Sequence, residues 1–256
     1  MDVIDFFNVE IDPISNTDIR NGHYMIDLLD EYNYELNDLP QVSLKDAFIK
    51  SLSTFELYKN RTLLESVFEK KKKFDYVPIG AIPFHFNTQM FVGDNNQIVP
   101  SIVCPRILDE ASYAFLGHEF HHAVKDLNPK ERKIRDRVAE VIPMFYEMIC
   151  SDIEPDENVS KEILKRRLAL LELDKQSETE DKARRLQYFN SYYYALALYN
   201  KYRKEENKLL VLRLISRVLM EEISTLDLLK MLNIYDQDVD YNVSWELEMI
   251  KEYIRK

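Results

Sequence analysis

Glycine, cysteine and long apolar runs are scarce in this chain of 256 residues, and each scarcity excludes something. With only four glycines and nine prolines, we expect few tight turns and long regular elements. Cys104 and Cys150 fit no metal or redox spacing, so we expect buried thiols. No window approaches the roughly 18 apolar residues of a membrane span, and the first residues lack the pattern of a signal peptide. We therefore expect a cytoplasmic protein.

Positive charge is also in deficit, with a net charge of -11 and a pI near 5.1. A nucleic-acid-binding surface needs clustered basic residues, and the only basic run is Lys70 to Lys73, which suits a helix C-terminus. Hydrophobic residues at 46% and charged residues at 31% are typical of an ordinary globular protein with a substantial core. The composition excludes nucleic acid as the expected partner.

Helical spacing of apolar residues dominates the chain, so we expect a mostly α fold. Residues rich in Val, Ile and Phe at Val77 to Val92 and Gln97 to Val103, separated by a turn cluster, predict one small β hairpin. We expect a single compact unit with an N-terminal helical part (1–76), a β hairpin region (77–106) and a helical core (107–256). The expected helices are 43–74 (one or a pair), 109–126, 128–150, one opening at 160, 177–202, 207–222, 224–233 and 244–255.

The strongest functional signal is an H-E-x-x-H motif formed by His118, Glu119 and His122. Residues four apart lie one turn apart on the same helical face, so both imidazoles can reach one ion. This pattern is typical of zinc proteases, in which the glutamate is the general base. Three of the five histidines lie within residues 118–122, which makes a chance motif unattractive. We expect His121 and His85 to be packed, substrate-facing or near the ligands rather than to bind the metal, although His121, three residues from His118, could compete with His122.

A catalytic zinc site needs a third protein ligand, and Glu131, Glu140 and Glu147 are the candidates. Glu140 lies in an otherwise apolar stretch, and buried carboxylates are usually paired or bound to metal, so Glu140 is our choice. A strictly antiparallel second helix would carry Glu140 about 12 Å past the ion. That helix must therefore start nearer Lys133 or cross obliquely.

A tyrosine-rich cluster around Tyr192 and Tyr193 is the second candidate for chemistry. A phenol opposite the metal can stabilise the oxyanion that develops during peptide hydrolysis. The alternative is that these tyrosines pack in the core with their hydroxyls satisfied locally, as most buried tyrosines do. The segment from Ile79 to Val92 is placed to offer an edge strand to an extended peptide.

The sequence resembles a shortened member of the M3 family of zinc metallopeptidases, which includes thimet oligopeptidase and oligoendopeptidase F. His118 to His122 reads H-E-F-H-H where the family has H-E-F-G-H. The resemblance implies a zincin-like helical catalytic domain of the gluzincin type, with one Zn²⁺ per chain, and favours Tyr193 over Tyr192 as the phenol donor. The other similar segments are 139–147 around Glu140, 189–194 with the tyrosines, and 224–230, which resembles the family's S-x-x-P-L-E-L-L-K element.

Three departures from the family pattern keep a second reading open. No histidine follows His122, the interval from His122 to Glu140 is short, and there is no room for the family's large N-terminal half. We expect a zinc metallopeptidase acting on peptides. The alternative is a degenerate peptide-binding or regulatory protein on the same scaffold, and a purely structural helical protein is a remote third.

Overall fold

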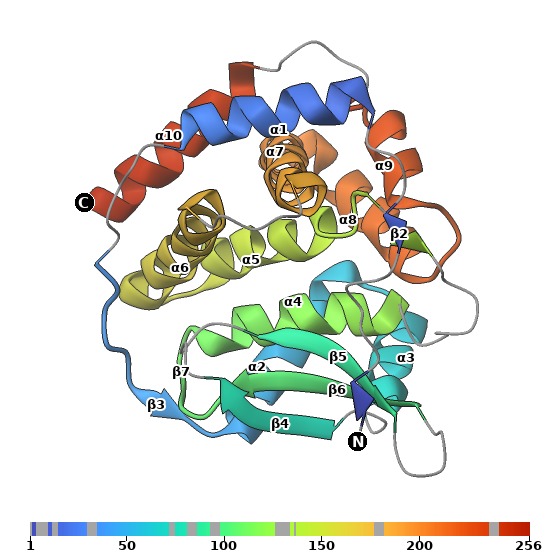
Figure 1. Ribbon diagram of the computed structural model, residues 1–256, viewed down its shortest axis with the longest axis vertical. Coiled ribbons are helices and arrows are strands. Elements are labelled where there is room, and N and C mark those ends of the chain that lie inside the picture. The colour runs from blue at the N-terminus through green and yellow to red at the C-terminus, as the bar shows by residue number, and fades with distance from the viewer. Residues whose placement is uncertain are drawn as a thin grey trace.

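The fold is mostly helical in the computed structural model, in which the described residues are 2–3, 10–11, 15–29, 35–71, 75–80, 86–92, 98–125, 134–135, 137–176, 182–235 and 241–256. Ten α-helices and a short 3₁₀ turn occupy these residues (Figure 1). The elements are α1 (Asn16–Leu28), α2 (Leu44–Phe55), η2 (Glu56–Tyr58), α3 (Arg61–Lys71), α4 (Ser112–Lys125), α5 (Val141–Ile153), α6 (Glu157–Gln176), α7 (Lys182–Tyr202), α8 (Glu205–Leu219), α9 (Thr225–Met231) and α10 (Tyr241–Arg255).

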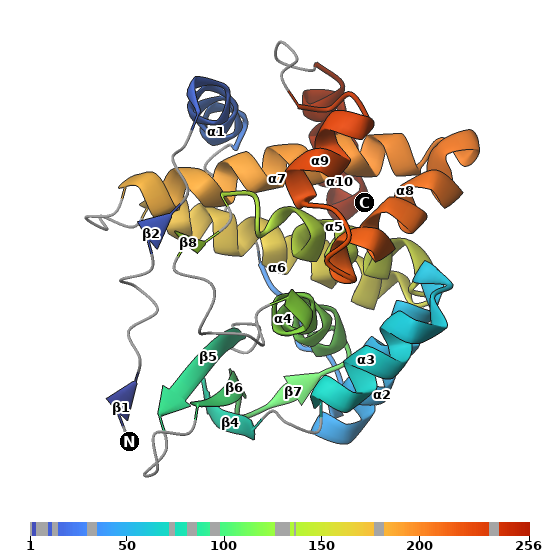
Figure 2. The same cartoon turned by 90° about the vertical axis from the view of Figure 1, so that its right-hand side faces the viewer.

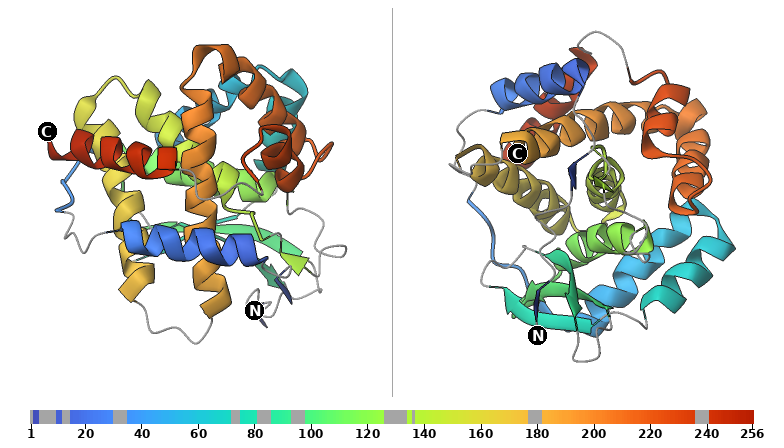
Figure 3. Two further views of the ribbon diagram at one scale, coloured as in Figure 1. Left: turned by 90° about the horizontal axis from the view of Figure 1, so that it is seen from above. Right: turned by 45° about the vertical axis from the view of Figure 1, so that its right-hand side comes forward.

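The elements stack in layers around α4 and α5. In Figure 1 a β-sheet forms the lowest layer, α4 lies on it, α5 lies on α4, and α7 and then α1 follow. Figure 2 shows α4 end-on between the sheet and the α5–α7 layer. The views in Figure 3 place α2 and α3 beside α4, and α10 beside α6 and α7. Helix α4, which carries the H-E-x-x-H motif, is therefore covered on several sides.

The main sheet has four strands in the order β1-β5-β6-β4. The predicted hairpin is confirmed, because β5 pairs antiparallel with β6. The prediction was incomplete, because β4 is a separate strand that pairs parallel with β6, and β1 pairs antiparallel with the outer end of β5. The strands are β1 (Asp2–Val3), β4 (Asp75–Gly80), β5 (Asn87–Val92) and β6 (Ile98–Pro105).

Two short pairings join distant parts of the chain. Strand β2 (Glu10–Ile11) pairs parallel with β8 (Ile134–Arg135), and β3 (Gln41–Val42) pairs antiparallel with β7 (Leu108–Asp109). The β2–β8 pair connects the N-terminal region to the segment that precedes α5. The turn predicted at 93–96 and His85 lie outside the described residues.

Two predicted helix starts are confirmed by their caps, whereas the helices expected to open at residues 160, 207 and 244 begin earlier, at Glu157, Glu205 and Tyr241. Ser43 caps α2 by accepting the Asp46 backbone N–H, and Ser224 with Asp227 forms the predicted capping box of α9. Helix α1, which the sequence analysis did not predict as a full helix, opens on a Ser15–Asp18 capping box and ends at Leu28. Within the described residues, no helix is long and apolar enough to cross a membrane.

The prediction of one helix over residues 128–150 was wrong in its first half. Residues 134–135 form β8, residues 137–140 form a turn, and α5 begins only at Val141. Residues 126–133, which hold the predicted helix start and Glu131, lie outside the described part of the chain. Glu140 occupies the N-cap position of α5, so it lies at the beginning of that helix and not deep within it. This start removes the predicted overshoot past the ion.

Helices α4 and α5 approach closely at Gly117. A Cβ atom built on Gly117 would collide with the ring of Tyr146, which lies against the backbone of α4. The ring is fully buried, and its hydroxyl donates to the carbonyl oxygen of Ser51. The absence of a side chain at Gly117 therefore lets α5 lie against the motif helix.

Candidate metal centre

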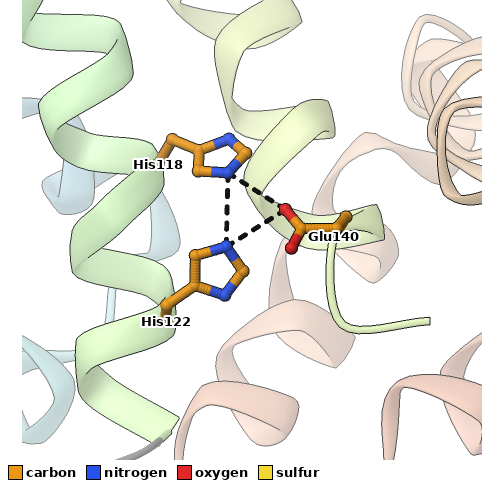
Figure 4. A group of neighbouring side chains, drawn as sticks. All are labelled: His118, His122 and Glu140. Carbon is orange, nitrogen blue, oxygen red and sulfur yellow. Dashed lines mark hydrogen bonds and ion pairs between the residues drawn. The ribbon is translucent and has the colours of Figure 1, made fainter. Parts of the chain in front are cut away.

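His118, His122 and Glu140 meet at one point between α4 and the start of α5 (Figure 4). Glu140 Oε2 lies 3.1 Å from Nε2 of His118 and 3.1 Å from Nε2 of His122. The two Nε2 atoms are 3.2 Å apart. Glu140 and His118 are 2% and 5% exposed, and the side chain of His122 is partly buried. The three predicted ligands therefore form a compact, nearly equilateral triangle of donor atoms.

The size of this triangle fits a tetrahedral metal ion. Bonds of about 2.0–2.1 Å at tetrahedral angles would separate neighbouring ligand atoms by about 3.3 Å. The observed separations of 3.1–3.2 Å are close to that value. Two histidines and one carboxylate are the protein ligands of one common class of catalytic zinc site, which keeps the fourth position open. The residues present fit a zinc ion.

A second carboxylate from α5 fixes the orientation of the His118 ring. Glu147 Oε1 lies 2.7 Å from His118 Nδ1, so Nδ1 carries the proton and donates it to Glu147. The lone pair of a neutral His118 then lies on Nε2, which faces Glu140 and His122. An imidazole lone pair facing a carboxylate needs a cation between them. The partner of His118 Nδ1 therefore prepares Nε2 for a metal.

Arg167 from α6 completes this arrangement behind His118. Its Nε donates to Glu147 Oε2 at 2.6 Å, and a second nitrogen donates to Glu147 Oε1. Burial raises the pKa of Glu147, but Arg167 and then His118 outweigh burial and hold it below its ordinary value. Burial lowers the pKa of Arg167, and Glu147 reverses that effect and raises it. Glu147 is therefore ionised and the guanidinium charged at neutral pH.

Without a metal the same carboxylates favour a proton on His118. Burial lowers the pKa of His118, but Glu147 and Glu140 outweigh it and raise the pKa to about 9. The ring, protonated on both nitrogens, would then donate to both carboxylates. A metal ion must displace this proton.

His121 lies on a neighbouring face of α4, among aromatic residues. Its Nδ1 donates to the Gly117 carbonyl oxygen at 2.7 Å, and its Nε2 accepts the Tyr58 hydroxyl at 2.8 Å. The ring stacks on Phe55 with centroids 4.5 Å apart, and the residue is 1% exposed. Both ring nitrogens are thus engaged away from the metal centre. Of the roles that the sequence left open for His121, the structure supports packing.

Glu119, the expected general base, points from α4 toward the sheet. Thr88 on β5 donates its hydroxyl to Glu119 Oε2 at 2.6 Å. Glu119 directly follows the candidate ligand His118 in α4. Sequence reasoning missed Thr88, which the observed β5–β6 register places opposite buried Ile102.

The tyrosine cluster of α7 is buried. Tyr192 and Tyr193 are 1% and 3% exposed, and the Tyr193 ring packs edge-on against Tyr24 of α1 with centroids 6.3 Å apart. Tyr192 lies near the guanidinium of Arg167. Tyr192 is therefore close to the Glu147–Arg167 pair that contacts His118. The assignment of either phenol to an oxyanion remains a prediction.

Two residues that sequence reasoning set aside or did not see act next to the ligands. Glu147 was predicted to lie too far along the helix to bind the metal directly. In the structure its carboxylate contacts Nδ1 of His118, the ring nitrogen that faces away from the other two candidate ligands. Its spacing of seven residues from Glu140, two helical turns, was the available signal. Arg167 carried no sequence signal of its own.

Comparisons of this chain with protein-family models, with curated proteins and with solved structures found no match. The family resemblance drawn from the sequence therefore stays a prediction.

Proposed function

We propose that the protein is a zinc-dependent metallopeptidase of the gluzincin type. The resemblance of its sequence to the M3 family favours the same function. The observation that carries the proposal is the triangle of His118, His122 and Glu140 with edges of 3.1–3.2 Å. Supporting it, the acid of the motif, Glu119, directly follows the candidate ligand His118 in α4. A structural site with the same three ligands would have no use for this acid.

The roles of the residues follow from their chemistry. His118, His122 and Glu140 would hold the zinc ion, which supplies a polarised carbonyl and a water of lowered pKa. Glu119 takes the proton of the attacking water and delivers it to the leaving amine. Glu147 keeps the proton of His118 on Nδ1, and Arg167 holds Glu147 in place. Tyr193, or alternatively Tyr192, would donate its phenol proton to the oxyanion.

Strand β5, which contacts the motif helix α4, offers an edge with which an extended peptide could pair. On the outer side of β5, strand β1 covers Val92 and Phe91. In the described part of the chain no strand pairs with that side at Asn87 to Met90. Thr88 lies in this uncovered stretch and contacts Glu119, so a peptide added there would run past the proposed base. This is the part of the predicted 79–92 edge that we propose for substrate.

The alternative function is a peptide-binding or regulatory protein that has lost catalysis on the same scaffold. The observation that favours it is the absence of any histidine after His122, because the family has a substrate-contacting histidine just before its tyrosines. Under both proposed functions the protein binds zinc, but only a peptidase cleaves peptides.

Glu119→Gln separates the two. The wild type should cleave members of a broad quenched-fluorescent peptide library when loaded with zinc. The variant should keep its zinc and lose activity by about 10²- to 10⁴-fold, because the proton acceptor is gone. Glu65→Gln makes the same change at an exposed position on α3 and should leave turnover unchanged. A wild type that cleaves nothing, or a Glu119→Gln variant that cleaves equally well, excludes the peptidase.

A further inference from the structure

Thr88 donates a short hydrogen bond to the side chain of Glu119. Its Oγ1 lies 2.6 Å from Glu119 Oε2 and 3.4 Å from the Glu119 carbonyl oxygen. A distance of about 2.5–2.7 Å is typical of a hydroxyl that donates to an ionised carboxylate. A carboxylate can only accept, so the hydroxyl is the donor. The single hydroxyl proton is directed at the side chain rather than at the backbone.

The sheet register explains why this hydroxyl reaches α4. Thr88 stands directly opposite Ile102 in the antiparallel β5–β6 pair, and opposite residues point to the same face of a sheet. Ile102 is fully buried, and both strands pack against α4. The face that carries Ile102 and Thr88 is therefore the face toward the motif helix. Glu119 meets Thr88 there.

This contact restrains one oxygen of the carboxylate. Among the described residues, none donates a hydrogen bond to Glu119 Oε1. A glutamate side chain has three rotatable bonds, and Glu119 as a whole residue is 7% exposed. A hydrogen bond at Oε2 limits rotation about the last of these bonds.

We propose that Thr88 is a positioning residue, which holds Glu119 by Oε2 so that Oε1 accepts the proton of the attacking water. This inference rests on the proposed function. Oε1 gains the proton as the water oxygen bonds to the peptide carbon, and the proton then moves to the amine as the C–N bond breaks. Oε2 remains an acceptor while Oε1 is protonated, so the Thr88 bond persists through both transfers. The strand offered to the peptide thereby also orients the base.

Thr88→Val tests the inference, because valine keeps the shape and removes the hydroxyl. With the peptide that the wild type cleaves fastest, kcat should fall about tenfold to a hundredfold, because small errors in placing a reacting group cost that much. KM and zinc content should stay unchanged. Thr88→Ser restores a hydroxyl and should recover most of kcat. Thr54→Val removes another buried hydroxyl, bonded to the Lys50 carbonyl oxygen, and should keep the wild-type kcat.

The outcomes separate this inference from the function on which it rests. If the wild type cleaves with zinc and Thr88→Val has the same kcat, only the role of Thr88 is overturned. A loss of kcat that Thr88→Ser does not rescue, or a matching loss in Thr54→Val, also overturns it. If the wild type cleaves nothing, the proposed function and this inference fall together. Thr88→Ala replaces the valine variant if circular dichroism shows that the latter is unfolded, with the same result expected.

Discussion

Two faces of helix α4 carry histidines of opposite character. His118 and His122 face the carboxylates of α5, whereas His121, within the same five residues, faces Phe55 and Tyr58. On the first face the Nε2 atoms point at a shared oxygen and suit a cation. On the second face the donor and the acceptor of one neutral ring are both satisfied by neutral groups. Neighbours from other elements, and not the residue type, decide what a histidine does.

Outside the three candidate ligands, the largest effect on this comparison should come from Glu147, the carboxylate that accepts from His118 Nδ1. Glu147→Gln weakens the acceptor at Nδ1 and leaves Arg167 without its charged partner. Zinc affinity should fall about 10- to 100-fold, as is usual when the group that orients a ligating histidine is lost. Competition with a chelator of known zinc affinity measures it.

Glu162→Gln is the matched control for Glu147→Gln. Glu162 is also a fully buried glutamate paired with an arginine, since Arg166 Nε donates to its Oε1 at 3.0 Å, but it has no contact with the ligands. This variant should be less stable with unchanged zinc affinity. Equal zinc affinity in both variants would contradict a role for Glu147 at the metal.

Acidification should lower the zinc affinity of the centre formed by His118, His122 and Glu140, by a smaller amount than Glu147→Gln does for each pH unit. Burial lowers the pKa of His118, but Glu147 and Glu140 raise it to about 9 in the metal-free protein. Below that pH the ring is protonated, so zinc must displace one proton. Affinity should rise about tenfold per pH unit up to about pH 9 and level off above it. The same chelator competition at several pH values measures this slope, and an affinity that does not change with pH would refute it.

The smallest effect on zinc should come from the other face. His121→Phe keeps the ring against Phe55 and removes both hydrogen bonds, which leaves the buried Tyr58 hydroxyl without its acceptor. Urea unfolding should show a loss of about 1–3 kcal/mol, with zinc affinity unchanged. His122→Phe, the same change one residue later, should abolish tight zinc binding. If His121→Phe also lost the metal, the two faces would not be independent.

The group of His118, His122 and Glu140, which could hold a metal ion, could be predicted from the sequence because its signals are local. His118 and His122 follow from helical spacing, and Glu140 from a carboxylate among apolar residues. The geometric doubt about Glu140 arose because Asn128-Pro129 resembles a helix start. The structure instead pairs β8 with β2, more than 120 positions earlier in the chain, and begins α5 at Val141. A pairing over that separation leaves no local pattern.

The same limit applies to the groups around the ligands. The β5–β6 hairpin was predicted from its turn and strand composition, but the parallel pairing of β4 with β6 was not, because parallel strands are not joined by a tight turn. Thr88 and Arg167 act through tertiary contacts with α4 and α5, and neither lies in a motif. The sequence thus predicts the three candidate ligands better than the residues that orient them.

Metal analysis of the purified protein is the most direct test of the central claim, that His118, His122 and Glu140 hold a zinc ion. The wild type should carry about one tightly bound zinc per chain, and Glu140→Ala should carry none. Folding of the variant is checked by circular dichroism. A folded wild type that binds no zinc at micromolar metal, or a Glu140→Ala variant that retains it, would contradict the account.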